Sequence, residues 1–189
     1  MKKVLFLMCL VFMTGFVYAG NHKGEQKQLD ARIDFSGSCG TTITNSEGIF
    51  YHFWGYCFKE DKVYPPKYWG SWPLYFFGTK IPVKVTVKNN GPRAKAKIRI
   101  KTEAYCLLPD GSNGVALMEP KTIDVEVLKG EEKVIDASFV TEYAAGTESG
   151  LDRFIIKVLH INEGGGKGNP EPALIMSKEG VFCPPEYIP

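Results

Sequence analysis

The sequence predicts an all-β protein built as an antiparallel β-sandwich, and three observations lead to this prediction. After Thr79, apolar residues recur at every second position, as in IPVKVTVKNNG and AKAKIRIKTEAYCLL, which is the period of strands with one buried face. Turn-forming runs such as NNGP and PDGSNG separate these stretches. No stretch of this region has the apolar period of a helix, so we expect the strands to pair and to bury their apolar faces between two sheets.

The expected strands can be placed in order along the chain. ARIDFSG, within residues 30–38, predicts a first short strand in which Ile33 and Phe35 share a face. In the next expected strand, Val83, Val85 and Val87 share the buried face. The remaining strands are expected at residues 96–104, 123–127, 133–140, 152–162 and 173–183.

Three of these stretches carry a resemblance to a known family. VKVTVKNNGPRAKAKIRI, VEVLKGEEKVIDASF and GLDRFIIKVLHINE together resemble the bacterial cell-adhesion-related domain, CARDB, an immunoglobulin-like β-sandwich of exported proteins. The resemblance extends from Lys80 to Glu163. It implies an immunoglobulin-like fold and a structural or adhesive context, and it implies no catalytic residues. The insertion CLLPDGSNGVALMEP and Cys106 depart from the family pattern, so a neighbouring immunoglobulin-like group is the alternative.

The N-terminus has the three parts of a secretory signal. MKKVLFLMCLVFMTGFVYAG combines a basic start at Lys2 and Lys3, an apolar run and a small-residue exit before Gly20. We therefore expect residues 1–19 to be a signal peptide and the mature chain to begin at Gly20. Because the apolar run is too short to cross about 30 Å of hydrocarbon, no transmembrane anchor is expected after cleavage. The sequence predicts a secreted or periplasmic protein.

The charge of the chain argues against a nucleic-acid partner. The chain has 23 basic and 21 acidic residues, and removal of the leader takes away Lys2 and Lys3 but no acid. The exported form is therefore near neutral. Its lysines alternate with acidic or apolar residues, whereas nucleic-acid binding normally requires a basic face that displaces counterions from phosphates.

The cysteines of the exported chain suggest disulfides. Cys9 would leave with the leader, which leaves Cys39, Cys57, Cys106 and Cys183, and an even number of cysteines in an exported chain favours bridges. Three pairings are possible, and the sequence does not choose among them. Our preferred arrangement joins Cys39 to Cys57 and Cys106 to Cys183.

No group of residues has the spacing of a metal site or a catalytic site. His22, His52 and His160 lie far from one another and from the cysteines, whereas metal ligands cluster at short spacing. The sequence contains no G-x-S-x-G, no H-E-x-x-H and no phosphate-binding glycine loop. We therefore expect no metal, no cofactor, no catalytic residues and no enzymatic activity.

Residues 49–78 are unusually rich in aromatic side chains. The stretch IFYHFWGYCFKEDKVYPPKYWGSWPLYFFG contains Trp54, Trp69 and Trp72, which are all the tryptophans of the chain. It could form a second small core, a surface for a protein partner or for self-assembly, or a platform on which sugar rings stack. If the rings are exposed, the candidate anchors are Trp69, Trp72 and Tyr75.

These observations predict three regions and a binding function. Residues 1–19 are the expected signal peptide, 20–78 an aromatic, cysteine-containing region packed on the sandwich, and 79–189 the sandwich. The expected function is that of a non-catalytic binding or assembly module at the cell exterior or in the periplasm, with a protein partner or a second copy. The alternative is a carbohydrate-binding accessory module that uses exposed Trp and Tyr rings.

Overall fold

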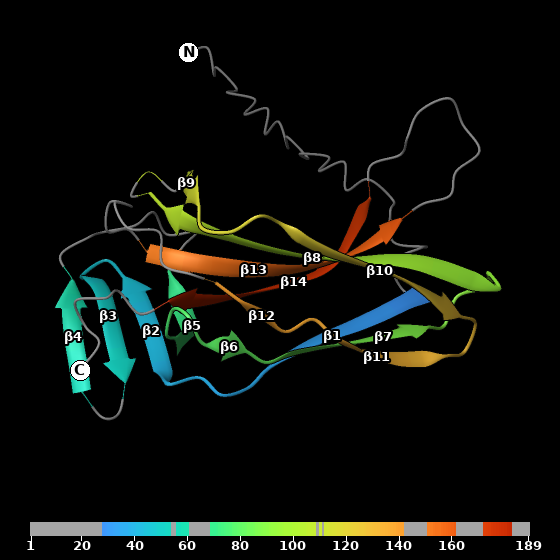
Figure 1. Ribbon diagram of the computed structural model, residues 1–189, viewed down its shortest axis with the longest axis horizontal. Helices are drawn as coiled ribbons and strands as arrows, with labels where there is room; N and C mark the ends of the chain where they lie inside the picture. Colours follow the sequence, from blue (N-terminus) through green and yellow to red (C-terminus); the bar gives the residue numbers. More distant parts are fainter. Residues whose placement is uncertain are drawn as a thin grey trace, which may run out of the picture.

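The computed structural model describes residues 28–53, 56–60, 69–108, 110, 112–141, 151–161 and 172–182. Strands β1 to β14 make up the regular structure of these residues, which confirms the all-β prediction (Figure 1). No helix within the described ranges is long and apolar enough to span a membrane. The expected signal peptide, the expected start at Gly20, Trp54 and Cys183 lie outside the described residues.

A small sheet forms one layer of the molecule. Its strands lie in the order β1-β7-β11, where β1 is Leu29–Phe35, β7 is Val83–Asn89 and β11 is Glu132–Asp136. Both pairings are antiparallel. A two-stranded sheet of β6 (Lys80–Ile81) and β12 (Phe139–Val140) flanks it along the chain.

A nine-stranded sheet forms the rest of the described structure. Its main path runs β10-β8-β13-β14-β5-β2-β3-β4, and β9 pairs with β8 beside that path. The bounds of its longer strands are Lys95–Leu107 for β8, Lys121–Leu128 for β10, Leu151–Ile161 for β13 and Ala173–Phe182 for β14. The shorter β9 is Asn113–Ala116.

We call the last four strands of this path the arm. They are β2 (Gly40–Asn45), β3 (Gly48–Phe53), β4 (Tyr56–Glu60) and β5 (Gly70–Tyr75), and they lie side by side at one end of the molecule (Figure 1). β5 joins β14 in parallel, unlike the other pairings among described strands and unlike the antiparallel arrangement expected for the sheets. The join consists of Val181 paired with Leu74 and Phe182 paired with Tyr75.

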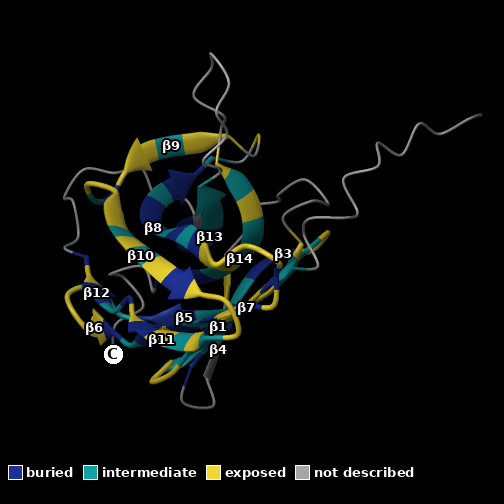
Figure 2. Ribbon diagram, turned by 90° about the vertical axis from the view of Figure 1, so that its right-hand side faces the viewer, coloured by how far each residue is buried: buried dark blue, intermediate teal, exposed yellow. Residues whose placement is uncertain are grey.

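The main core lies between the small sheet and the β10-β8-β13-β14 part of the large one. Alternation decides which side chains enter it, because Val83, Val85 and Val87 of β7 are fully buried while Lys84 and Lys88, which point to the other face, are exposed. Burial follows the same alternation on β8 as far as Thr102, whereas residues 152–156 of β13 are all buried; Figure 2 colours the strands by this burial. The two sheets are thus held by apolar faces that the sequence pattern predicted.

Phe154 is the aromatic centre of this core. Its ring is fully buried and lies edge-on to Phe35, Tyr75 and Phe139, with ring centroids 5.3, 5.6 and 5.1 Å away. Aromatic pairs at such separations add attraction beyond the area that they bury. Gly180, directly opposite Phe154 on β14, leaves the space that the ring fills.

A second, smaller core lies on the other face of the large sheet. It contains Tyr51 and Phe53 from the arm together with Leu107 and Val181 from the ends of β8 and β14. The predicted aromatic region therefore does build a core of its own. The residues before position 79 do not form a region apart from the sandwich, because β1, which precedes the arm in the sequence, pairs with β7 of the small sheet. The boundary expected at residue 79 stays a prediction.

Two strand predictions differ in detail from the structure. Residues 133–140 were expected to form one strand, but β11 ends at Asp136, whose carboxylate accepts hydrogen bonds from both the backbone N–H and the hydroxyl of Ser138. This Asx turn diverts the chain before β12 begins. A turn was expected at PDGSNG, but its last two residues begin β9, Asn113–Ala116, which pairs with β8.

A lysine from the opposite sheet closes part of the edge on each open side of the sandwich. Lys178 of β14 donates to the backbone carbonyl of Ile33 in β1 at 3.0 Å, and Lys133 of β11 donates to that of Glu126 in β10 at 3.2 Å. Unpaired edge carbonyls are sites at which foreign strands can add, and lysine is a common means of blocking them.

We expect Gly180→Ala to lower the free energy of unfolding by about 1–3 kcal/mol, because the added methyl group would overlap the Phe154 ring in a core that holds that ring from several sides. Chemical denaturation measures the change. Ser177→Ala, at an exposed position on the same strand, is the control and should change stability by less than about 0.5 kcal/mol. Equal stability of the two variants would show that the ring has room to move.

Candidate functional site

The three aromatic residues singled out as anchors lie in three different environments. Trp69, which immediately precedes β5, is 41% exposed. Trp72 is half-buried and packs against the second core, with its indole over Gly70. Tyr75 is only 2% exposed, because it belongs to the main core. Trp69 thus keeps a large part of its surface exposed, whereas the prediction that Tyr75 presents its ring to a ligand is wrong.

Burial also changes the chemistry of Tyr75. Its hydroxyl donates to the backbone carbonyl of Ser36 at 3.2 Å. Burial, and in addition the nearby charge of the Cys39 thiolate, raises the pKa of Tyr75 to about 12. The phenol is therefore neutral near pH 7 and acts as a structural hydrogen-bond donor.

The arm has one face that neither core covers. The strand register places Thr41, Ile43 and Phe50 on the side opposite Tyr51, and puts Ser71 and Pro73 on that side of β5. Alternation along β5 adds Trp69 to it. We call this surface the arm face, and its residues are Thr41, Ile43, Phe50, His52, Lys59, Trp69, Ser71 and Pro73.

Charge is sparse on the arm face. Lys59 is its one formally charged side chain among those described, and its ammonium group lies 5.9 Å from the centroid of the Phe50 ring, which is a cation–π distance. Ile43 and Trp69 supply exposed apolar surface, while Phe50 and Pro73 are half-buried. The arm face therefore combines apolar rings with neutral polar groups.

Two linked hydrogen bonds on the arm face fix which hydroxyl donates and which accepts. The Thr41 hydroxyl donates to the backbone carbonyl of Trp72 at 3.0 Å, and its oxygen lies 2.9 Å from the Ser71 hydroxyl. Because a hydroxyl has a single proton, Ser71 must donate to Thr41. The exposed Ser71 oxygen therefore faces solvent as an acceptor, which suits a ligand that brings N–H or O–H donors.

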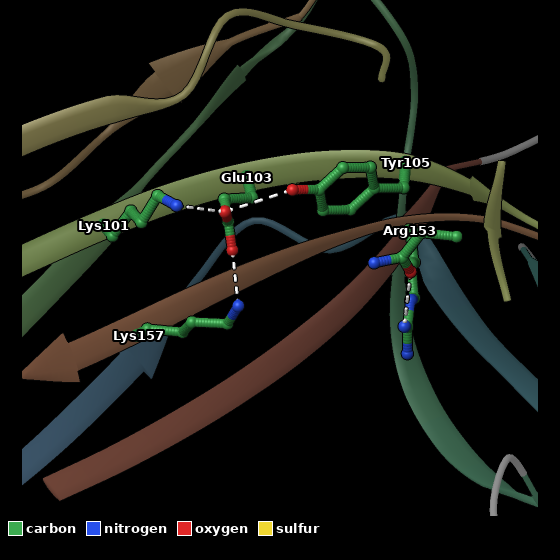
Figure 3. A network of polar contacts seen from close by, with 6 residues as sticks. Lys101, Glu103, Tyr105, Arg153 and Lys157 are labelled. Atoms are coloured by element: carbon green, nitrogen blue, oxygen red, sulfur yellow. Dashed lines mark hydrogen bonds and ion pairs between the residues drawn. The ribbon is translucent and has the colours of Figure 1, made fainter. Parts of the chain in front are cut away.

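A charged network lies elsewhere, on the outer face of β8 and β13 (Figure 3). Lys101 and Lys157 are directly opposite each other in the ladder, which would be destabilising for like charges alone. Glu103 neutralises this repulsion, since each of its carboxylate oxygens contacts one lysine at 2.5 Å. The Tyr105 hydroxyl adds a hydrogen bond of 3.1 Å to the same carboxylate.

Glu103 is held in its ionised form. Glu103 is only 4% exposed as a residue, and burial alone would raise the pKa of its carboxyl group. The hydrogen bonds from Lys101 and Lys157 and the charge of Lys157 outweigh burial and hold the pKa of Glu103 below its usual value. A carboxylate fixed in this way is a weak base and does not carry a proton near neutral pH, so its chemistry is that of a structural counter-ion.

Arg153 continues the network toward β9. Its guanidinium donates to Glu179 and to the side chain of Asn113, each at 3.0 Å. Since Asn113 begins β9, this contact ties the short strand to the face of the large sheet. The network was not predicted, because its members come from strands whose register the sequence does not reveal.

The cysteines give no disulfide among the residues that the structure describes. The Cys39 thiol donates to the backbone carbonyl of Leu74 at 3.2 Å, and burial raises its pKa. β3 separates β2 from β4, so the strands near Cys39 and Cys57 lie about two strand spacings, or roughly 10 Å, apart. This exceeds the span of roughly 7 Å that a disulfide bridges, so the preferred Cys39–Cys57 pairing would require the backbone to move. Cys106 is buried, and its pairing with Cys183 stays a prediction.

Comparisons with known proteins add little. No family model and no curated protein matches the sequence. Among solved structures, the chain is similar to the Pseudomonas fluorescens alkylpurine DNA glycosylase AlkC bound to DNA containing an abasic site analog, with 15% sequence identity and a TM-score of 0.38. The match covers 58% of this chain and 27% of that chain. A similarity at this level carries no argument about function.

We expect Glu103→Gln to lower the free energy of unfolding near pH 7 by about 2 kcal/mol, because it leaves Lys101 and Lys157 opposed without their shared counter-ion. The pKa of Glu103 is lower in the folded chain than its value of about 4.3 in an unfolded one. Its contribution to stability is therefore present above that value and disappears as the pH falls through the folded pKa. Urea denaturation of wild type and of Glu103→Gln at several acidic pH values measures the difference between their free energies of unfolding. This difference should become smaller as the pH is lowered.

Glu126→Gln is the matched control, since it removes the carboxylate of an exposed pair with Lys95 and should cost less than about 1 kcal/mol. A gap between wild type and Glu103→Gln that keeps its size into the acid would contradict the assignment of an ionised Glu103 as the source of this stability.

Proposed function

We propose that the protein is an exported, non-catalytic module with an immunoglobulin-like sandwich of the CARDB kind, which binds a protein partner or a second copy through the arm face. The strand order supports this proposal, because a β1-β7-β11 sheet lies opposite β10-β8-β13-β14, and two such opposed sheets are what an immunoglobulin-like sandwich requires. The secretory pattern of residues 1–19 supports export.

The single observation that carries the binding role is the chemistry of the arm face. The centres of protein interfaces are depleted in charge and enriched in aromatic residues. The arm face has this composition, with Trp69 and Ile43 exposed and Phe50 half-buried between them and Lys59. Tryptophan is also the residue type that most often dominates binding energy when an interface forms around it.

Rigidity of the arm favours the same function. β2 is bonded on both sides, to β3 and to β5, and β5 is held against β14. Side chains on such a frame lose little conformational freedom when a partner arrives, which leaves more of the contact energy for affinity.

A photo-crosslinking residue in place of Ser71 tests the proposal in cells that naturally produce the protein. We expect a covalent adduct from position 71, because that side chain is exposed at the middle of the arm face. The same residue in place of Ser177, an exposed serine on β14 outside the arm face, is the matched control. The mass of the adduct separates a second copy from another protein, and equal yields from both positions would sink the proposal.

Substitution of the tryptophans should separate binding from folding. We expect Trp69→Ala to reduce the adduct from position 71 by at least about tenfold, with an unchanged denaturation midpoint. Trp72→Ala should instead lower the free energy of unfolding by about 2 kcal/mol, because its indole packs on the second core. Loss of stability in Trp69→Ala, without a specific loss of crosslinking, would assign Trp69 to the core instead.

Sugar binding is a second candidate, and one observation favours it. The acceptor oxygen of Ser71 lies on the same face as the exposed Trp69, two residues along the chain, and sugars bring both hydroxyl donors and an apolar ring face. Titration of neutral oligosaccharides against intrinsic tryptophan fluorescence distinguishes it. A saturable shift that disappears in both Trp69→Ala and Ser71→Ala would replace the protein partner by a glycan.

A further inference from the structure

We propose that the outer edge of β10 is a second binding site, which accepts an extended strand of a partner protein with basic and apolar side chains in alternation. This site is independent of the arm face, since β10 and the arm lie at opposite ends of the strand path of the large sheet. No described strand pairs with β10 on the side away from β8. An exposed edge of this kind offers a row of backbone donors and acceptors to an incoming strand.

Backbone geometry identifies which groups of β10 face outward. The N–H of Lys129 donates to the carbonyl of Ala94 at 2.9 Å, which continues the β10–β8 ladder by one residue. In an antiparallel ladder, alternate residues bond to the neighbouring strand and the others point away from it. The backbone groups of Thr122, Asp124, Glu126 and Leu128 therefore face the open side.

Side chains occupy the backbone groups at the Leu128 end of this edge, whereas those at the Thr122 end stay open to an incoming strand. The Leu128 N–H donates to the Glu131 carboxylate at 2.7 Å, and Lys133 occupies the Glu126 carbonyl. The incoming strand is thus directed to Thr122 and Asp124, with the Glu126 N–H as its last donor. Much of β10 is yellow in Figure 2, in agreement with the exposure of Thr122 and Asp124.

Charge on β10 defines the partner. Asp124 is bound through both carboxylate oxygens to Arg99 at 2.7 Å, and Glu126 is bound to Lys95 at 3.0 Å. Both bases come from β8, so the described partners of the two acid side chains lie on that side, while the Lys133 ammonium lies on the open side at the Glu126 carbonyl. The acid side chains are still 54% and 46% exposed, respectively. Basic side chains directly opposite Asp124 and Glu126 would complete a base-acid-base row across three strands.

Apolar side chains between these acids complete the pattern. Ile123 and Val125 are half-buried at the margin of the main core. Valine or isoleucine opposite them would extend the core by one strand and cover their exposed parts. The favoured partner segment therefore carries lysine or arginine at two positions separated by a single apolar residue.

The same charges disfavour a second copy of β10 as the partner. The two antiparallel registers of fullest overlap are centred on Asp124 and on Val125. They would place Asp124 opposite itself or opposite Glu126, so like charges would meet. The edge is built to reject its own copy and to accept a strand of opposite charge.

Synthetic pentapeptides test the site on the purified, isotope-labelled protein by NMR. The probe has the order lysine, valine, lysine, valine, threonine, which aligns antiparallel with residues 122–126. We expect it to shift the amide signals of Thr122 and Asp124 and to slow their hydrogen exchange. Replacement of both lysines by glutamate should weaken binding by at least about tenfold, since two attractive pairs become repulsive.

A peptide methylated on the backbone nitrogens of both lysines and of the threonine is the control for mere charge attraction. It keeps the charges but cannot donate to β10, so it should not bind detectably. The double variant Asp124→Asn, Glu126→Gln should lower the affinity for the lysine peptide by roughly three- to tenfold. Equal binding of the methylated peptide, protection at other strands, or no effect of the double variant would each overturn the proposal.

Thr122→Pro provides a further variant that spares the fold. Proline removes only the N–H that faces the open side, and edge strands tolerate proline at such positions. We expect the denaturation midpoint to be nearly unchanged and peptide binding to be lost. Undiminished binding would show that the peptide does not add to this edge.

Discussion

The arrangement of the molecule depends on the short parallel join between β14 and β5. Val181 and Leu74 point to one side of the sheet and enter the second core, while Phe182 and Tyr75 point to the other side and enter the main core. This register sets the alternation for the whole arm. It decides that Tyr51 and Trp72 are on the covered side, and that Ile43 and Ser71 are on the arm face. A slip of one residue at the join would exchange these two sets.

Charged groups help to determine where another chain can approach the outer surfaces. Glu103 permits two lysines to lie opposite each other, and Lys133 and Lys178 bond to edge carbonyls of the sheet that they face. Exposed ion pairs are individually weak. Their placement nevertheless determines where another chain can approach, because an edge with its carbonyls occupied has fewer hydrogen bonds to offer.

The sequence pattern predicted strands correctly where one face of the strand is apolar and the other polar. β7 and β8 were predicted for this reason, and β1, β10, β13 and β14 lie close to their expected ranges. The arm strands were not predicted, because GIFYHF has large side chains on both faces: Tyr51 fills the second core while Phe50 lies on the arm face. Periodicity cannot identify a strand whose two faces are alike. Tyr75 was misplaced for a related reason, since its side depends on a pairing with a strand more than a hundred residues later.

The attachment of the arm has a mechanical consequence. The arm is bonded to the sandwich through only two residue pairs of β14, whereas β1 is bonded to β7 through seven. A tensile load applied to the arm would first separate the short join. The load would then pass along residues 36–39 into β1. The hydrogen bonds between β1 and β7 would resist it together, because the load acts on all of them at once. The attachment of the arm therefore yields first, while the ladders inside the arm and in the sandwich behind it hold longer.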